Sequence, residues 1–275
     1  PFFFHPHPVI LDCLLSRGLG DVYKRQARGP EEDLEAVQKM RSAVGADIGL
    51  MIDAHSWWRM GNKTYSPETI LNLANAMAEF HPTWLEEPLP PENHEAYSKL
   101  KEKAQFPIAT GEHEPNEEGF MDLFDKRCTD FIQMDVCCQG GFAMAKRIFE
   151  KVKEYELRFA FHSWGTNLEV LAAAHLGVCW EEDVVEWLEF PCYSSANSPG
   201  MYPFAAATEI LKDPLEIEEG YLIMPDGPGL GITIDERIVE KYPFIQGPWS
   251  YFKIDNPPET VAVTGDHSIK WIEGV

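Results

Sequence analysis

The segment Ile48-Gly-Leu-Met-Ile-Asp53-Ala-His55 is a short apolar run that ends on a carboxylate, with a histidine two residues later. The same arrangement, an apolar run closed by an acidic residue or a histidine, recurs at Trp84–Glu86, Ile108–Glu112, Phe131–Asp135, Phe159–His162 and Val185–Glu189. Each interval between run ends is long enough for a helix. Strands alternating with helices in this way predict an α/β fold of the TIM (β/α) barrel type, in which the C-terminal strand ends converge on one active site.

The overall composition limits the classes of partner. The chain has 275 residues, 44% of them hydrophobic, and a formal net charge of −22, which suits one barrel or two smaller domains. Binding to nucleic acid or to an anionic membrane requires clustered Lys and Arg, so both partners are disfavoured. No apolar run reaches the roughly 20 residues of a membrane span. The six cysteines have no CxxC spacing and are interpreted as free thiols in a reducing, cytoplasmic compartment.

Three parts of the chain are predicted. Residues 1–26 have neither helical nor alternating periodicity and end in a stretch that resembles a translated adapter, so we interpret them as a non-native or disordered leader. Residues 27–215 carry the regular alternation and form a partial barrel. Within it, Pro30 and the pair Ser66-Pro67 are typical of helix starts. Residues 216–275 are predicted to be an extended segment with turns.

Three successive strand ends carry carboxylates: Asp53, Glu86 and Glu112. Convergent buried carboxylates repel one another and therefore favour a bound cation. Ligation by oxygen alone points to a hard ion such as Mg²⁺, which keeps positions open for substrate oxygens. Salt bridges to Lys or Arg are the alternative, and the segments next to Glu86 and Glu112 contain no basic residue.

The next strand ends carry Asp135, His162 and Glu189. A carboxylate bonded to one imidazole nitrogen fixes the tautomer and leaves the other nitrogen free to move a proton. Asp135 and His162 are therefore a candidate catalytic pair, although a histidine at a strand end can also be structural. Glu189 could stabilise a developing enolate if burial keeps it protonated, or it could serve as an ionised carboxylate beside the metal.

The ordered set of motifs resembles the mandelate racemase branch of the enolase superfamily. The motifs are Ile52-Asp53, Leu85-Glu-Glu-Pro88, Gly111-Glu112, Gln133-Met-Asp135 with Gly140-Gly141, Phe161-His-Ser163, Trp187-Leu-Glu189 and Pro225–Gly231. The resemblance implies an enolase C-terminal domain-like barrel with Mg²⁺ on Asp53, Glu86 and Glu112. It also implies a His162–Asp135 dyad, an enolate-stabilising Glu189, and removal of a proton α to a carboxylate.

Two further histidines make the chain similar to sugar-acid dehydratases of that branch, including rhamnonate dehydratase-like members. His55, in Asp53-Ala-His55, is a candidate acid for a departing hydroxyl, or else a residue that orients its neighbours. His113, in Gly111-Glu-His113, is a candidate substrate contact, as is Arg59 beside Trp57 and Trp58; a surface arginine stacked on tryptophan is the alternative for Arg59. We therefore expect an Mg²⁺-dependent hydro-lyase that dehydrates an aldonate to a 2-keto-3-deoxy acid.

The chain departs from the resembled family at its N-terminal side. The family's capping domain and two strands before Asp53 have no counterpart, so we expect six of eight barrel strands, unpaired edges, and a truncated chain that is inactive by itself. Residues 216–275 are expected to pack on that missing capping domain, as the resemblance implies, and the full-length parent is expected to be a homo-oligomer. Alternatives are a racemase or epimerase of a hydroxy acid, an inactive fragment, and a Zn²⁺ hydrolase; the hydrolase would need a His-x-His pair, found only at His5-Pro-His7.

Overall fold

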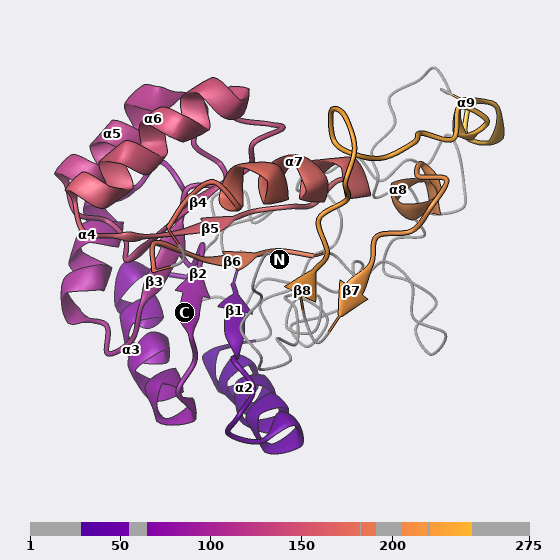
Figure 1. Ribbon diagram of the computed structural model, residues 1–275. Coiled ribbons are helices and arrows are strands. Elements are labelled where there is room, and N and C mark those ends of the chain that lie inside the picture. The colour runs from indigo at the N-terminus through magenta and orange to yellow at the C-terminus, as the bar shows by residue number, and fades with distance from the viewer. Residues whose placement is uncertain (1–28, 55–64, 182, 191–204, 219–220, 244–275) are drawn as a thin grey trace.

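A computed structural model describes residues 29–54, 65–181, 183–190, 205–218 and 221–243 of the chain. Within these ranges one parallel sheet has the strand order β1-β2-β3-β4-β5-β6. Its strands are Met51–Asp53 (β1), Trp84–Glu86 (β2), Ile108–Thr110 (β3), Phe131–Met134 (β4), Arg158–Phe161 (β5) and Val185–Leu188 (β6). Each strand pairs with the next in the chain, and the sheet curls into a half-barrel (Figure 1). The predicted fold, an incomplete TIM barrel, is confirmed.

Helices lie on the outer side of the curved sheet, and all of them except α2, which precedes β1, connect consecutive strands (Figure 1). They are Pro30–Val44 (α2), Pro67–Met77 (α3) with the short 3₁₀ turn Ala78–Phe80 (η1), His94–Lys103 (α4), Glu117–Asp125 (α5), Gly141–Glu154 (α6) and Asn167–Gly177 (α7). One helix between each pair of strands is the connection that parallel neighbours require. Every strand therefore runs in the same direction, and all C-terminal strand ends meet at one rim.

The helix starts follow the local sequence signals. Pro30 is the first residue of α2, where its missing N–H costs no helical hydrogen bond. Ser66 caps α3, and its hydroxyl accepts the N–H of Thr69 at 3.1 Å. Val37 of α2 and Ile70 of α3 are buried in the core. Capping therefore fixes where these helices begin, and their apolar faces fix how they pack on the sheet.

Alternation along the strands divides the core into two layers. Side chains of one parity point to the helices and join the main core; they include Ile52, Leu85, Ile132, Phe161 and Leu188. Side chains of the other parity form a separate inner cluster: Met51, Trp84, Ala109, Phe131 and Ala160, with Trp187 packed against it. This inner cluster fills the concave side of the half-barrel, as layers of side chains do in closed barrels.

The C-terminal part contains short elements. They are Ala205–Glu209 (α8), the antiparallel pair Ile217–Glu218 (β7) and Tyr221–Leu222 (β8), and Ile238–Lys241 (α9). Leu222 is fully buried and joins the main core, so this segment packs on the barrel. The predicted leader and residues 244–275 lie outside the described residues.

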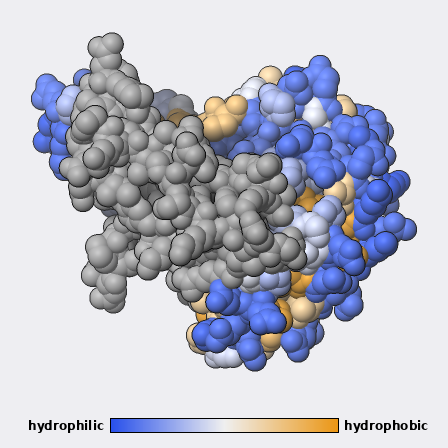
Figure 2. All heavy atoms as spheres, turned by 180° about the vertical axis from the view of Figure 1, so that it is seen from behind, coloured by the Kyte–Doolittle hydropathy of each residue, from blue (hydrophilic) through white to orange (hydrophobic). Residues whose placement is uncertain are grey.

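The described surface is largely polar. Figure 2 shows hydrophilic residues over most of the coloured face, with hydrophobic areas confined to small patches. Among the described helices, none has the length and apolar character that crossing a membrane would require. The barrel's apolar side chains are therefore used mainly in its own core.

Candidate active site

The inner layer leads directly to the candidate site. Two residues beyond an inner-layer side chain, a strand again points inward. Met51 is followed in this way by Asp53, Trp84 by Glu86, Ala160 by His162 and Trp187 by Glu189; Asp135 lies four residues beyond Phe131. The alternation that builds the apolar layer therefore directs these polar side chains into the mouth of the half-barrel.

Glu112 reaches the same mouth by a different route. Gly111, which follows the last residue of β3 and has the parity of the inner layer, has a φ of +132°, and a Cβ there would lie 2.5 Å from the carbonyl oxygen of Gln133. Only glycine fits this turn. The break in alternation brings forward Glu112, whose side chain is only 4% exposed.

We expect Gly111→Ala to destabilise the fold strongly. The unfavourable backbone conformation costs about 1–3 kcal/mol, and overlap with the neighbouring strand adds about 1–3 kcal/mol, as for overpacked cores. Gly45→Ala is the matched control, because Gly45 also has a positive φ, of +80°, but no atom lies within 4 Å of the place that a Cβ would take there. Urea unfolding of both variants gives the comparison. Equal losses would show that the contact with Gln133 contributes nothing.

His162 lies between two carboxylates. Its Nδ1 is 3.1 Å from Oδ2 of Asp135, and its Nε2 is 3.0 Å from Oε2 of Glu112. The other oxygen of Asp135 accepts the backbone N–H groups of Cys137 and Cys138, at 2.8 and 3.0 Å. Asp135 is therefore held in place by the start of its loop, and it in turn orients the imidazole.

These contacts change the proton affinities of the pair. Burial lowers the pKa of His162, but the charges of Glu112 and Asp135 outweigh burial and raise this pKa to about 9. Burial raises the pKa of Asp135, while the hydrogen bond from His162 more than compensates and leaves it below its ordinary value. Without a bound metal, both shifts favour an imidazolium between carboxylates at neutral pH.

The metal-capable groups in the described residues differ from the predicted triad. Asp53 and Glu86 are neighbours in strand register, and the indole N–H of Trp84 donates to Glu86 at 2.9 Å. The groups whose ligand atoms lie within 4.8 Å of one another are instead Glu87–Glu112–His113 and Asp135–His162–Glu169. A carboxylate–histidine site able to hold a divalent ion is thus present, while ligation by Asp53, Glu86 and Glu112 together stays a prediction.

His113 bridges two carboxylates at the rim. Its Nδ1 lies 2.8 Å from Oε2 of Glu87 and 3.1 Å from Oε1 of Glu112. Burial lowers the pKa of His113, but these two hydrogen bonds outweigh it and raise the pKa to about 10. Its ring is 39% exposed, so the predicted substrate contact remains sterically open.

Glu189 is anchored by one oxygen. Its Oε2 accepts the backbone N–H of Ser163 at 2.7 Å, which ties the end of β6 to the residue after His162. Its role toward an enolate stays a prediction. His55 and Arg59, the candidate acid and a candidate substrate contact, lie outside the described residues.

Sequence reasoning missed three buried polar residues next to the site. Alternation along β2 would direct Glu87 away from the mouth, but its positive φ of 40° turns it inward. The side chain of Gln139 links the loops after β3 and β4: it accepts the N–H of Asp135 and donates to the carbonyls of Gly111 and Glu114, each at 2.7 Å.

Glu169 is the third missed residue, and it did have a sequence signal. Thr166-Asn-Leu-Glu169 has the spacing of a capping box at a helix start. The hydroxyl of Thr166 does cap α7, accepting the N–H of Leu168 at 3.2 Å. The carboxylate of Glu169 instead accepts the N–H groups of Trp164 and Gly165, and it lies beside Asp135 and His162.

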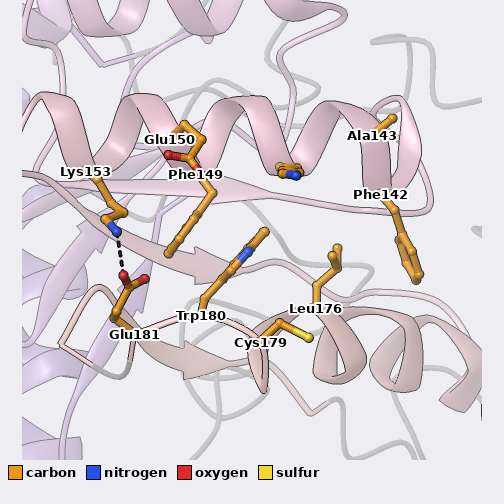
Figure 3. Close-up of a pocket in the computed structure, with 10 residues that line it drawn as sticks. Phe142, Ala143, Phe149, Glu150, Lys153, Leu176, Cys179, Trp180 and Glu181 are labelled. Carbon is orange, nitrogen blue, oxygen red and sulfur yellow. Dashed lines mark hydrogen bonds and ion pairs between the residues drawn. The ribbon is translucent and has the colours of Figure 1, made fainter.

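A groove of about 570 Å³ lies away from these residues, between α6 and the end of α7. Figure 3 shows Phe149 facing Trp180 and Lys153 paired with Glu181. The two rings are stacked with centroids 3.9 Å apart. None of the strand-end residues lines this groove, so the candidate chemistry lies at the strand ends.

Comparison with known proteins identifies the family of this chain. The family model described as "Enolase C-terminal domain-like" matches residues 16–238, which is most of the chain. The chain belongs to the enolase C-terminal domain-like family. The resemblance to the enolase superfamily that the motifs indicated is thereby confirmed.

Individual members of the enolase superfamily resemble the chain over about half their length. The D-galactarolactone cycloisomerase of Agrobacterium fabrum is 31% identical over 214 residues, covering 78% of this chain and 54% of that protein. The arabinonate dehydratase of Saccharolobus solfataricus is 26% identical over 216 residues, covering 78% and 53%. Among solved structures, the 3,6-anhydro-D-galactonate cycloisomerase from Zobellia galactanivorans is 30% identical with a TM-score of 0.67, covering 83% of this chain and 62% of that one.

Proposed function

We propose that this chain forms the catalytic half-barrel of an enzyme that removes a proton α to the carboxylate of a sugar acid and then expels a hydroxyl, giving a 2-keto-3-deoxy acid. The observation that carries the proposal is the position of His162. Its Nδ1 is held by Asp135, and its Nε2 faces Glu112 in the barrel mouth. The names of the related dehydratase and cycloisomerases support a sugar-acid substrate.

The donor chemistry of the rim fits a divalent cation. Asp53, Glu86 and Glu112 offer only oxygen, and oxygen ligands suit Mg²⁺. We propose these three as the ligands; when bound, the ion would act as a Lewis acid toward substrate oxygens. With Glu112 occupied in this way, His162 would lose its strongest charged neighbour. Its pKa would then return toward the ordinary range, where a neutral imidazole can act as a base.

The remaining roles are assigned to residues of the same rim. Asp135 fixes the Nδ1–H tautomer of His162, so that Nε2 accepts the α-proton. Glu189 supports the developing enolate, His55 protonates the departing hydroxyl, and His113 and Arg59 contact the substrate. The enzyme is proposed to be a cytoplasmic homo-oligomer, in line with the free thiols of Cys128, Cys137, Cys138 and Cys179.

A screen of sugar acids in D₂O tests the reaction. Formation of a keto acid, followed with a carbonyl reagent, is the expected result. Exchange of the α-proton for deuterium without any keto product would instead establish the racemase or epimerase alternative. The two related cycloisomerases add a third outcome. In that outcome the enzyme consumes a lactone, and the other sugar acids do not exchange their α-protons for deuterium. The 275-residue chain, assayed alone beside the complete enzyme, tests the expectation that it is inactive by itself.

Metal binding tests the ligand assignment without any assay of activity. We expect Glu86→Gln to weaken Mg²⁺ binding strongly. Loss of a residue that only hydrogen-bonds a metal ligand lowers metal affinity by roughly 10–100-fold, and loss of a ligand should lower it further. Glu87→Gln is the matched control, since Glu87 is adjacent and buried but is not a proposed ligand. Calorimetric titration with Mg²⁺ measures both. If only Glu87→Gln abolishes binding, the ligands are Glu87, Glu112 and His113 instead.

A further inference from the structure

One buried cluster contains the proposed base, His162, together with Glu169, a residue that has no part in the proposed reaction. It combines Asp135 from the end of β4, His162 from the end of β5 and Glu169 from the first turn of α7. We propose that Asp135, His162 and Glu169 form a second cation site that takes a transition-metal ion such as Zn²⁺, separate from the oxygen-only site proposed for Mg²⁺.

The geometry of the cluster suits a small ion. One ligand atom from each residue lies within 4.8 Å of the other two. Two ligands that each lie about 2.1 Å from a tetrahedral ion are about 3.4 Å apart. The 3.1 Å between Nδ1 of His162 and Oδ2 of Asp135 is close to this separation, so small side-chain shifts would admit the ion.

Glu169 has an oxygen available for the ion. Its Oε1 accepts the N–H groups of Trp164 and Gly165. Within the described residues, its Oε2 takes part in no hydrogen bond, although Glu169 is only 8% exposed. Gly165 makes room for this oxygen, because a Cβ there would lie 1.8 Å from it. A carboxylate oxygen without a protein donor is available as a ligand for a cation.

The charges and the donor types separate this site from the Mg²⁺ site. Two carboxylates, a neutral imidazole and a divalent ion sum to zero charge, so the ion would leave no net charge buried. Imidazole nitrogen suits Zn²⁺, whereas Mg²⁺ prefers oxygen alone. His162 also separates them: its Nδ1 faces Asp135, in the second site, and its Nε2 faces Glu112, a proposed Mg²⁺ ligand.

Occupation of this site would switch off the base. A neutral imidazole carries one proton, so an ion on Nδ1 leaves that proton on Nε2. His162 could then no longer accept a proton from the substrate at Nε2. This inhibitory consequence rests on the proposed function, whereas binding of the ion does not.

Calorimetric titration of the chain with Zn²⁺, in excess Mg²⁺ and a non-thiol reductant, tests the site. We expect one Zn²⁺ per chain, with an affinity that falls at least about 10-fold in Glu169→Gln. Glutamine keeps an oxygen acceptor for Trp164 and Gly165, so the loop retains its support. Glu118→Gln, an exposed position, is the control for the same change in charge and should leave the affinity unchanged. If Glu169→Gln fails to fold, His162→Asn provides the second test.

Several outcomes would overturn the site. They are no binding in excess Mg²⁺, binding that survives both Glu169→Gln and His162→Asn, and binding lost only in the double variant Cys137→Ser, Cys138→Ser. In the complete enzyme, Zn²⁺ should inhibit α-proton exchange, and Glu169→Gln should relieve that inhibition. Binding without inhibition would confirm the site and count against His162 as the base.

Discussion

In the complete enzyme, His162→Asn is expected to slow α-proton exchange by about 100- to 10,000-fold, the range that a positioned general base contributes. Asparagine keeps a polar group of similar reach, but it has no nitrogen that can accept a proton near neutral pH. Exchange of the substrate α-proton in D₂O, followed by NMR, isolates this step from the later loss of hydroxyl. The same variant should bind substrate with little change, since the proton moves only in the transition state.

His175→Asn is the matched control for this experiment. His175 is also a partly buried histidine, but it lies on α7, and its Nε2 is 3.2 Å from the carbonyl of Leu230. The control should exchange the α-proton at the unaltered rate. If the exchange rate of the His162→Asn enzyme stays within about 10-fold of the parent rate, the loss is smaller than removal of a general base causes. His113 would then become the next candidate for the base.

The sequence was sufficient to predict the strand ends because two requirements coincide there. A parallel strand buried on both faces must be apolar throughout, so the polar residue that ends it stands out. Asp53, Glu86, Asp135, His162 and Glu189 each follow an inner-layer side chain by an even number of residues. Helix positions were similarly predictable from local signals such as Pro30 and Ser66.

The groupings within the rim could not be predicted in the same way. Glu87 has the wrong parity for the mouth, and its left-handed backbone is not encoded by any glycine. Glu112 contacts two imidazoles, and neither contact follows from strand order. Glu169 belongs to a helix start whose spacing indicates only a cap. Such contacts depend on the angles at which loops leave the strands, which alternation does not determine.

A second strong effect is expected behind the rim, at His94. Its Nε2 lies 2.9 Å from Oε1 of Glu114, and its Nδ1 lies 2.5 Å from Oδ2 of Asp122. These two contacts join α4 to the loop that carries Glu112 and to α5. The side chains of His94 and Glu114 are 9% and 5% exposed. Burial raises the pKa of Glu114, and the hydrogen bond from His94 opposes that rise.

We therefore expect His94→Ala to destabilise the fold by about 3–5 kcal/mol, because removing one partner leaves a buried charge uncompensated. Arg147→Ala is the control: its ion pair with Glu117 is largely exposed, at 55% and 37%, and exposed pairs add little to stability. Urea unfolding measures both variants. The double variant His94→Ala, Glu114→Gln should recover part of the loss, since the amide carries no charge. A double variant no more stable than His94→Ala would mean that lost packing, rather than the unpaired Glu114 carboxylate, accounts for the effect.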